Sequence, residues 1–227
     1  MNYLKIEINA NVKRVLFEGT KAIGIEFNQN GVDKKVFAKR ETILSAGAIG
    51  SPMILQYSGI GPAQLLKNYS IDIIQDAPLI GQNLQDHLQI RCAYKVKGVT
   101  TLNTQSSTLW GKFKIGLEYA LKRTGPLSMS PSQLGAFVKS SDNLELPDLQ
   151  FHIQPLSLDA FGKPLHKFDA LTASICNLNP ESRGTVEICS TNYKDAPKIT
   201  ANYLSTKRDR RIAAQSIRIT RNIRSKT

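Results

Sequence analysis

The stretch Gly47–Gly61, GAIGSPMILQYSGIG, decides the predicted fold. It follows Glu41–Ala46, ETILSA, a short apolar run that ends in small residues and is typical of a buried, parallel strand. Ser51 and Pro52 predict a helix that begins at this pair, with serine as its N-cap and proline in its first turn. Gly59 and Gly61 end this helix, and Pro62 then begins a short helix that extends to Asn68.

Two uses of the glycines stay open from the residues alone. Glycine after a strand lets a flat or phosphorylated ligand reach the backbone, and the N-terminus of the following helix offers N–H groups to negative charge. Glycine also permits two backbone segments to pack closely. The sequence therefore predicts either a ligand-binding turn or a tightly packed one.

The rest of the chain predicts two parts. Residues 5–38 alternate as a β-meander, with the Asn30-Gly31 pair in a tight turn. Beyond a boundary near Asp86, one helix over residues 109–122 accompanies strand-like runs at 88–96, 133–139, 148–154, 169–178 and 184–190. We expect a mixed fold of the α+β or α/β class, whose second part is an antiparallel sheet with this helix on its back.

Composition indicates an ordinary globular protein, with 41% hydrophobic and 21% charged residues. No apolar span suggests a transmembrane segment, and the charged, alternating N-terminus is unlike a signal peptide. The three cysteines, Cys92, Cys176 and Cys189, are odd in number and far apart, which argues against a disulfide framework or a metal site. They predict thiols in a reducing compartment, the cytoplasm.

The net charge of +12 is concentrated at the C-terminal end. Residues 207–227 contain eight Lys or Arg and one acid, Asp209. Ile212, Ile219 and Ile223 recur among these charges at helical spacing, which predicts an amphipathic helix with a solvated outer face. Because no nucleic-acid-binding motif accompanies the charge, we expect no nucleic-acid partner.

The order of residues in Gly47–Gly61 resembles the second signature of the glucose-methanol-choline (GMC) oxidoreductases, which are FAD-dependent alcohol oxidases and dehydrogenases. The resemblance continues through VKRVLFEGTKAIGIEF, PLIGQNLQDH, GPLSMSPSQLGAFVKS and ITANYLS, and it covers essentially the whole chain. Within this family, the sequence is most similar to bacterial choline-dehydrogenase-like alcohol dehydrogenases.

This resemblance implies a domain organisation and a cofactor. Residues 1–86 would be part of an FAD-binding, Rossmann-like domain, residues 87–200 a substrate-binding domain, and residues 201–227 a basic helix that leads back toward residues the chain lacks. The family's FAD would lie against Ser45, Ala46 and Gly47, and the backbone of Val12 would face its adenine. On the residues alone, a plain strand residue is the better explanation of Val12.

Two features of the family are absent from the sequence. The chain contains no G-x-G-x-x-G turn for the pyrophosphate, and it stops before the family's catalytic histidine. We therefore assign no catalytic residue and expect the chain alone to be inactive. The resemblance implies a parent enzyme that oxidises a primary alcohol to an aldehyde by hydride transfer to flavin, with the electron acceptor left open. The alternatives are a choline dehydrogenase fragment or a non-catalytic association module of a split enzyme, which would self-associate through unpaired sheet edges.

Three residues are candidates for the substrate cavity. Gln89 stands where choline-oxidising relatives carry a glutamate that faces the quaternary ammonium, so we expect an uncharged alcohol rather than choline. His152 alternates with Gln150 and Gln154, opposite Leu149, Phe151 and Ile153, so it lies on a polar face that lines the cavity or faces solvent. Asn179 either contributes to the cavity or caps a turn.

The other two histidines have no predicted chemical role. His87, beside the link, is expected to bond backbone and to hold a turn. His166 lies in a polar loop.

Overall fold

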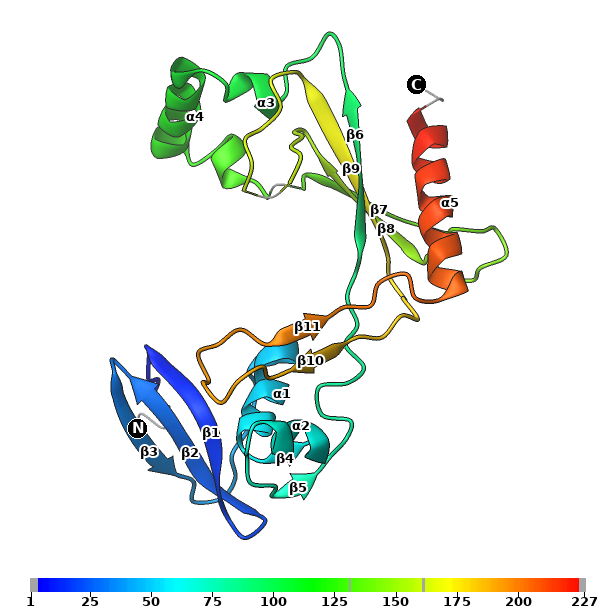
Figure 1. Ribbon diagram of the computed structural model, residues 1–227. Helices are drawn as coiled ribbons and strands as arrows, with labels where there is room; N and C mark the ends of the chain where they lie inside the picture. Colours follow the sequence, from blue (N-terminus) through cyan, green and yellow to red (C-terminus); the bar gives the residue numbers. More distant parts are fainter. Residues whose placement is uncertain (1–3, 131, 161, 225–227) are drawn as a thin grey trace. The chain divides into compact units, whose positions relative to one another are not determined.

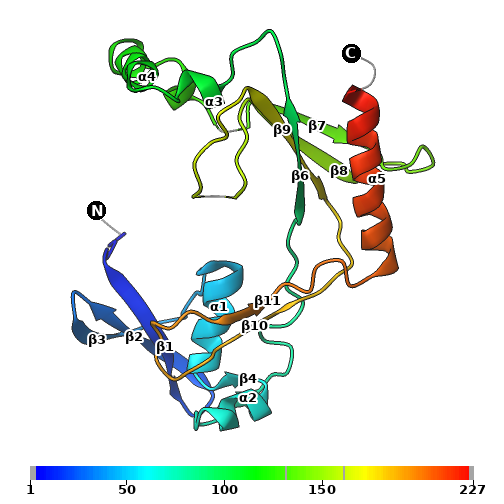
Figure 2. The same ribbon diagram turned by 45° about the horizontal axis from the view of Figure 1, so that its top comes forward.

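The computed structural model describes residues 4–130, 132–160 and 162–224, and it divides into two compact units (Figures 1 and 2). Unit 1 runs to Gln85 and includes Arg183–Tyr203, and unit 2 comprises Asp86–Ser182 with the chain from Leu204 onward. The chain therefore crosses between the units three times. A single break near Asp86 followed by a continuous domain over residues 87–200 does not describe this arrangement, because Arg183–Tyr203 packs with unit 1.

The first part of unit 1 is the predicted β-meander. Strands β1 (Ala10–Glu18), β2 (Lys21–Gln29) and β3 (Val32–Phe37) form one antiparallel sheet in that order. Asn30 and Gly31 both have positive φ, at +53° and +87°, as a tight hairpin between twisted strands requires. The prediction from alternation and the Asn-Gly pair is confirmed.

The signature stretch forms α1 (Gly47–Tyr57), which begins five residues earlier than predicted, with Ala46 at the N-cap position. Ser51 is not the N-cap; its hydroxyl reaches back to accept the N–H of Ala46 at 3.0 Å. The strand predicted for Glu41–Ala46 is wrong: this segment lies in none of the described strands, since a parallel strand needs a neighbour and no described strand pairs with it.

Short elements complete unit 1. Helix α2 (Ala63–Asn68) follows Pro62 as predicted. Strand β4 (Ile60–Gly61) pairs in parallel with β5 (Gln75–Asp76), and β10 (Thr185–Glu187) pairs antiparallel with β11 (Lys198–Thr200).

Unit 2 is built on the predicted antiparallel sheet. Its strands are β6 (Gln89–Lys95), β7 (Leu134–Val138), β8 (Leu149–Gln154) and β9 (Ala170–Asn177), in the order β6-β9-β8-β7. The helical elements are α3 (Leu102–Gln105), α4 (Leu109–Lys122), the 3-10 turn η1 (Pro126–Ser128) and α5 (Lys207–Arg224). None of the helices in the described ranges is long and apolar enough to cross a membrane.

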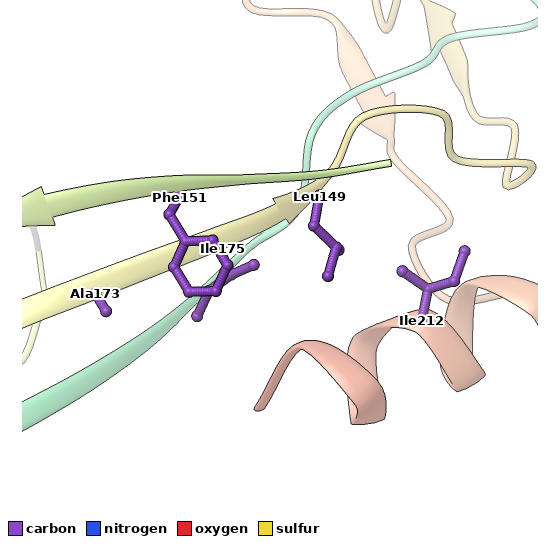
Figure 3. Close-up of a cluster of buried hydrophobic side chains, with 5 residues drawn as sticks. All are labelled: Leu149, Phe151, Ala173, Ile175 and Ile212. Atoms are coloured by element: carbon purple, nitrogen blue, oxygen red, sulfur yellow. The ribbon is translucent and has the colours of Figure 1, made fainter. Parts of the chain in front are cut away.

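The helix that covers this sheet is α5 and not α4. Figure 3 shows Ile212 of α5 facing Leu149, Phe151, Ala173 and Ile175 of the sheet, and these five residues form the buried core. The predicted covering helix, residues 109–122, is present but turns most of its apolar side chains outward. Helix α5 takes the position because its isoleucines recur on one face, as the sequence indicated.

Asp209 anchors the first turn of α5. This side chain is 4% exposed, and its carboxylate accepts the backbone N–H groups of Glu181 and Ser182 and the Ser182 hydroxyl at 2.5 to 3.1 Å. Burial opposes its ionisation, but these hydrogen bonds outweigh burial and lower the pKa of Asp209 from its usual value. One buried carboxylate thus ties α5 to the turn that follows β9.

Replacing Asp209 by alanine is expected to lower the free energy of unfolding by about 3 kcal/mol at pH 7, because buried donors lose their charged acceptor. Asp142→Ala, at an exposed acid, is the control and should change it by less than about 0.5 kcal/mol. Urea denaturation measures both. Equal effects of the two substitutions would contradict the anchoring role.

The same pair of variants gives a pH dependence. The folded pKa of Asp209 is lower than the unfolded value of about 3.9, so its contribution is complete above that pH and is lost as the pH falls through the folded pKa. The stability difference between wild type and Asp209→Ala should therefore shrink in acid. A difference that stays constant down to the lowest pH at which the chain folds would show that the charge contributes nothing.

Candidate functional site

The turn at Gly47 is open to a ligand. Residues 45–48 are exposed, Gly47 has φ +78°, and a Cβ built on it would meet no heavy atom within 4 Å. Gly59 differs: its φ is +84°, but a Cβ there would lie 2.3 Å from the Asp72 carbonyl oxygen. Each of the two uses left open by the sequence therefore occurs at one glycine: Gly59 permits close packing, and Gly47 leaves space at the backbone.

The N-terminus of α1 adds polarity to this opening. No side chain caps the helix and its first turn contains no acidic residue, so N–H groups that have no partner within the helix face outward. A hollow of about 300 Å³ lies beside it, lined by Ala48, Ser51 and Pro52 of α1 and by residues 79–85 of the link. The arrangement suits an extended, partly anionic molecule that approaches the backbone.

Gln56 holds α1 in place. It is fully buried, its Nε2 donates to the Val186 carbonyl at 3.0 Å, and its Oε1 accepts the Ile188 N–H at 2.9 Å. Gly81 completes the junction, because its carbonyl accepts the Val186 N–H at 2.7 Å and a Cβ on it would lie 2.2 Å from the Val186 oxygen. Sequence reasoning missed Gln56; the available signal was one amide on an otherwise apolar helix.

Ser58 connects α1 to the first sheet. Its buried hydroxyl accepts the Val15 N–H at 2.8 Å and donates to the Ile54 carbonyl at 2.5 Å. Val12 lies three residues before Val15 on the edge strand β1, at a register shift between Val12 and Arg14. Val12 and the Gly47 turn therefore belong to one unit, with α1 joined to the strand that carries Val12.

The sheet of unit 2 has one apolar and one polar face. Gln89 and Gln150 both lie opposite Cys176, and Arg91 and His152 both lie opposite Ser174, so these side chains share a face. The other face carries Leu149, Phe151 and Ile175 of the core. The predicted placement of His152 on a polar face is confirmed, and the register adds Gln89 to that face.

Arg91 joins the candidate residues on this face. It was overlooked in the sequence, although its position two residues after Gln89 on a strand requires the same face. It brings a basic side chain two residues along the strand from Gln89. Asp169, by contrast, is outside this face: it accepts the Thr101 N–H at 2.6 Å and the Thr104 hydroxyl, and these bonds lower its pKa.

Asn179 does not cap its turn. The cap comes from Asn177, whose Oδ1 accepts the Asn179 N–H at 3.1 Å, while Asn179 is exposed and its carbonyl accepts Arg208 Nη1 at 3.3 Å. The structure places Asn179 after the end of β9, beyond the rows that contain Gln89 and His152.

The two remaining histidines are structural. His87 Nε2 lies 3.1 Å from the Leu178 carbonyl, which confirms the predicted backbone bond. His166 lies 2.8 Å from Ser157 Oγ and 3.0 Å from Asp159 Oδ1. This Ser-His-Asp group is not a nucleophile site, because Ser157 is fully buried and serves to hold the loop.

Two family models described as GMC oxidoreductase match the chain, over residues 1–89 and over residues 180–227. The chain belongs to the GMC oxidoreductase family. No group of three or more potential metal ligands exists in the described part of this GMC protein.

Curated relatives of this GMC protein have related names. The oxygen-dependent choline dehydrogenase of Vibrio vulnificus (strain YJ016) is 40% identical over 93% of the chain, and the mitochondrial choline dehydrogenase of Homo sapiens is 38% identical over 97%. The matches cover 38% and 37% of those proteins, so the chain spans about two fifths of their length.

Solved structures share the fold. A formate oxidase superposes with a TM-score of 0.83 at 24% identity, covering 93% of this chain and 42% of that chain. The pyridoxine 4-oxidase from Mesorbium loti superposes with a TM-score of 0.76 at 25% identity, covering 94% of this chain and 38% of that one.

FAD is the cofactor of this family. The Gly47 turn fits such a group, since its backbone has open space around it and the uncapped helix N-terminus beside it suits negative charge.

Gln56→Leu is expected to lower the free energy of unfolding by about 2 to 4 kcal/mol, because the buried N–H of Ile188 and carbonyl of Val186 each lose a hydrogen-bond partner. Gln64→Leu, on the exposed side of α2, is the matched control and should change it by less than about 0.5 kcal/mol. Urea denaturation compares them. If both variants unfold at the wild-type midpoint, Gln56 does not hold α1.

Proposed function

We propose that this chain is part of an FAD-dependent alcohol dehydrogenase that oxidises a primary alcohol to an aldehyde. The alcohol carbon would lose a hydride to the flavin and its hydroxyl a proton to a base that this chain does not supply. The open Gly47 turn is the observation that carries the proposal, because it is the one part of the signature stretch where the backbone is free to meet a ligand. Family membership supports it.

Unit 1 would bind the cofactor and unit 2 the alcohol. Ser45, Ala46 and Gly47 would contact FAD, and the backbone of Val12 on the edge strand β1 would face the adenine. FAD supplies the hydride acceptor when it is bound. The chain's own residues hold and orient the cofactor through backbone groups, and no catalytic residue is assigned among them.

The polar face of unit 2 would face the substrate. Gln89 and His152 lie on it, and Asn179 at the end of β9 is a third candidate. Arg91 shares the face, so a cationic substrate would lie near a residue of like charge there. These residues favour an uncharged primary alcohol. Choline is the second candidate, and the names of the relatives are the observation that favours it.

The chain alone should not turn over, because it contains neither the G-x-G-x-x-G turn nor the family's catalytic histidine. Its compartment would be reducing, such as the cytoplasm, which suits the three free cysteines. Alcohol-dependent dye reduction by the chain alone would contradict this part of the proposal.

Titration of the chain with FAD is expected to perturb the visible flavin band weakly, and desalting should remove the flavin because the pyrophosphate-binding turn is absent. Gly47→Val should abolish the perturbation, since a side chain would occupy the open turn. Gly31→Val is the matched control, because Gly31 also has positive φ and open space and lies in the β2–β3 hairpin. An unperturbed flavin band with the wild-type chain, or equal loss in both variants, would contradict the assignment.

In the enzyme that contains this chain, Gln89→Glu is expected to raise kcat/KM for choline by about 10- to 100-fold, the effect of one charge-assisted contact. The value for an uncharged primary alcohol should not rise. Gln64→Glu adds the same charge on α2 and should leave both values unchanged. Wild-type kcat/KM that is higher for choline than for every uncharged alcohol tested would reverse the order of the two candidates.

A further inference from the structure

Helix α4 turns its apolar stripe outward. Leu109, Phe113, Leu117 and Leu121 follow one another at i, i+4 spacing, and Trp110 lies beside them, so the five side chains share one side of the helix. All five are exposed, Trp110 by 62% and Leu121 by 74%. The buried residue of the helix is Ile115, on the opposite side. A helix of a globular protein ordinarily has the reverse arrangement.

Basic side chains border the stripe. Lys114 and Lys112 are exposed on its two sides, and Lys122 and Arg123 end the helix, whereas Glu118 is the one acid of residues 109–123. Lys114 Nζ lies 5.4 Å from the centre of the Trp110 ring, and that ring stacks on Phe113 at 5.3 Å. The Lys114 ammonium is therefore held at the margin of an aromatic and aliphatic surface.

The apolar surface continues beyond the helix. Leu127 of η1 and Met129 after it are 59% and 49% exposed. Figures 1 and 2 show α4 next to α3 and away from α5, which covers the core face of the sheet.

The composition of this surface indicates which partner covers it. A helix that lies in a membrane interface has Trp, Phe and Leu on one side and Lys or Arg around them, because the ammonium groups reach anionic headgroups while the apolar side enters the acyl boundary. Residues 109–123 have that composition, and their excess of positive charge is complementary to an anionic surface.

We propose that α4 binds the surface of a bilayer that contains anionic phospholipid. The helix would lie in the plane of the interface, with Trp110, Phe113 and Leu117 inserted and Lys112 and Lys114 at the headgroups. This binding site is independent of the flavin site, and neither the GMC family nor the names of the relatives assign it.

Trp110 is the sole tryptophan of the chain, so its fluorescence reports this surface directly. The intact chain is mixed with vesicles of phosphatidylcholine alone or with added phosphatidylglycerol. We expect a blue shift of the emission with the anionic vesicles, and weaker binding at high salt. No shift with anionic vesicles, or an equal shift with both compositions, would overturn the proposal.

Two variants test the residues. Lys112→Gln/Lys114→Gln should weaken binding to anionic vesicles about 30-fold, at the usual contribution of one basic side chain near such a surface. Phe113→Ser/Leu117→Ser should abolish the blue shift with no loss of far-UV circular dichroism, since both side chains are exposed.

The basic helix α5 provides the matched control. Arg218→Gln/Arg221→Gln removes the same charge from exposed positions of α5 and should change binding less than about twofold. Weakening equal to that of the lysine variant would mean that the chain adsorbs as a polycation, which would overturn a site on α4.

Other occupants of the surface give different results. If a second copy of the chain covered the surface, the Trp110 emission would be blue-shifted in the absence of lipid and would shift to the red on dilution. If another segment of a longer protein that contains this chain covered the surface, that protein with Phe113→Cys would be protected from maleimide labelling at position 113 without vesicles. Either result would overturn the proposal, whereas protection that appears only with anionic vesicles supports it.

Discussion

The buried amide of Gln56 is the interaction on which unit 1 depends. Gln56 lies 130 residues from Val186 in sequence, and its hydrogen bonds to Val186 of β10 and to Ile188 just after it attach the signature helix as a neighbouring strand would. Because both polar atoms of the amide are paired, the side chain can be fully buried without an unsatisfied group. The position of the Gly47 turn follows from it, since that turn begins the same helix.

Unit 2 has a similar device at a different place. Asp209 joins α5 to the turn after β9 through backbone N–H groups, and the isoleucines of α5 then cover the apolar face of the sheet. In both units, the hydrogen bonds of one buried polar side chain attach a segment that is distant in sequence. The apolar core alone would fix such a segment less precisely, since hydrophobic contact has no direction.

Local signals predicted much of the fold. The meander followed from alternation and the Asn30-Gly31 pair, which depend on neighbours in sequence, and the helix predicted over residues 109–122 has the bounds of α4. The strand at Glu41–Ala46 failed, since a strand needs a partner that a short apolar run does not reveal. The covering role of residues 109–122 failed for a related reason: periodicity identifies an apolar face but does not say what it contacts.

The candidate site was predicted in part. Alternation placed His152 on a polar face, and register, which the sequence does not specify, added Gln89 and Arg91. The turn-cap alternative for Asn179 is wrong because Asn177 supplies the cap, and two asparagines two residues apart are equivalent in a sequence pattern. Gln56 was missed, since its structural role depends on hydrogen bonds to a strand more than a hundred residues later in the sequence.

The interleaving of the two units constrains how the chain is made. A ribosome releases Gln56 long before Val186, and at a synthesis rate of 5 to 20 residues per second the delay is roughly ten seconds. During that interval the signature helix has no β10 to dock against and its amide is hydrated. Neither unit can be finished as an early domain, because unit 1 waits for residues up to Tyr203 and unit 2 for the helix that follows. Folding of one unit before the other begins is therefore excluded for these two units, and the nascent polypeptide must stay unaggregated until α5 has been synthesised.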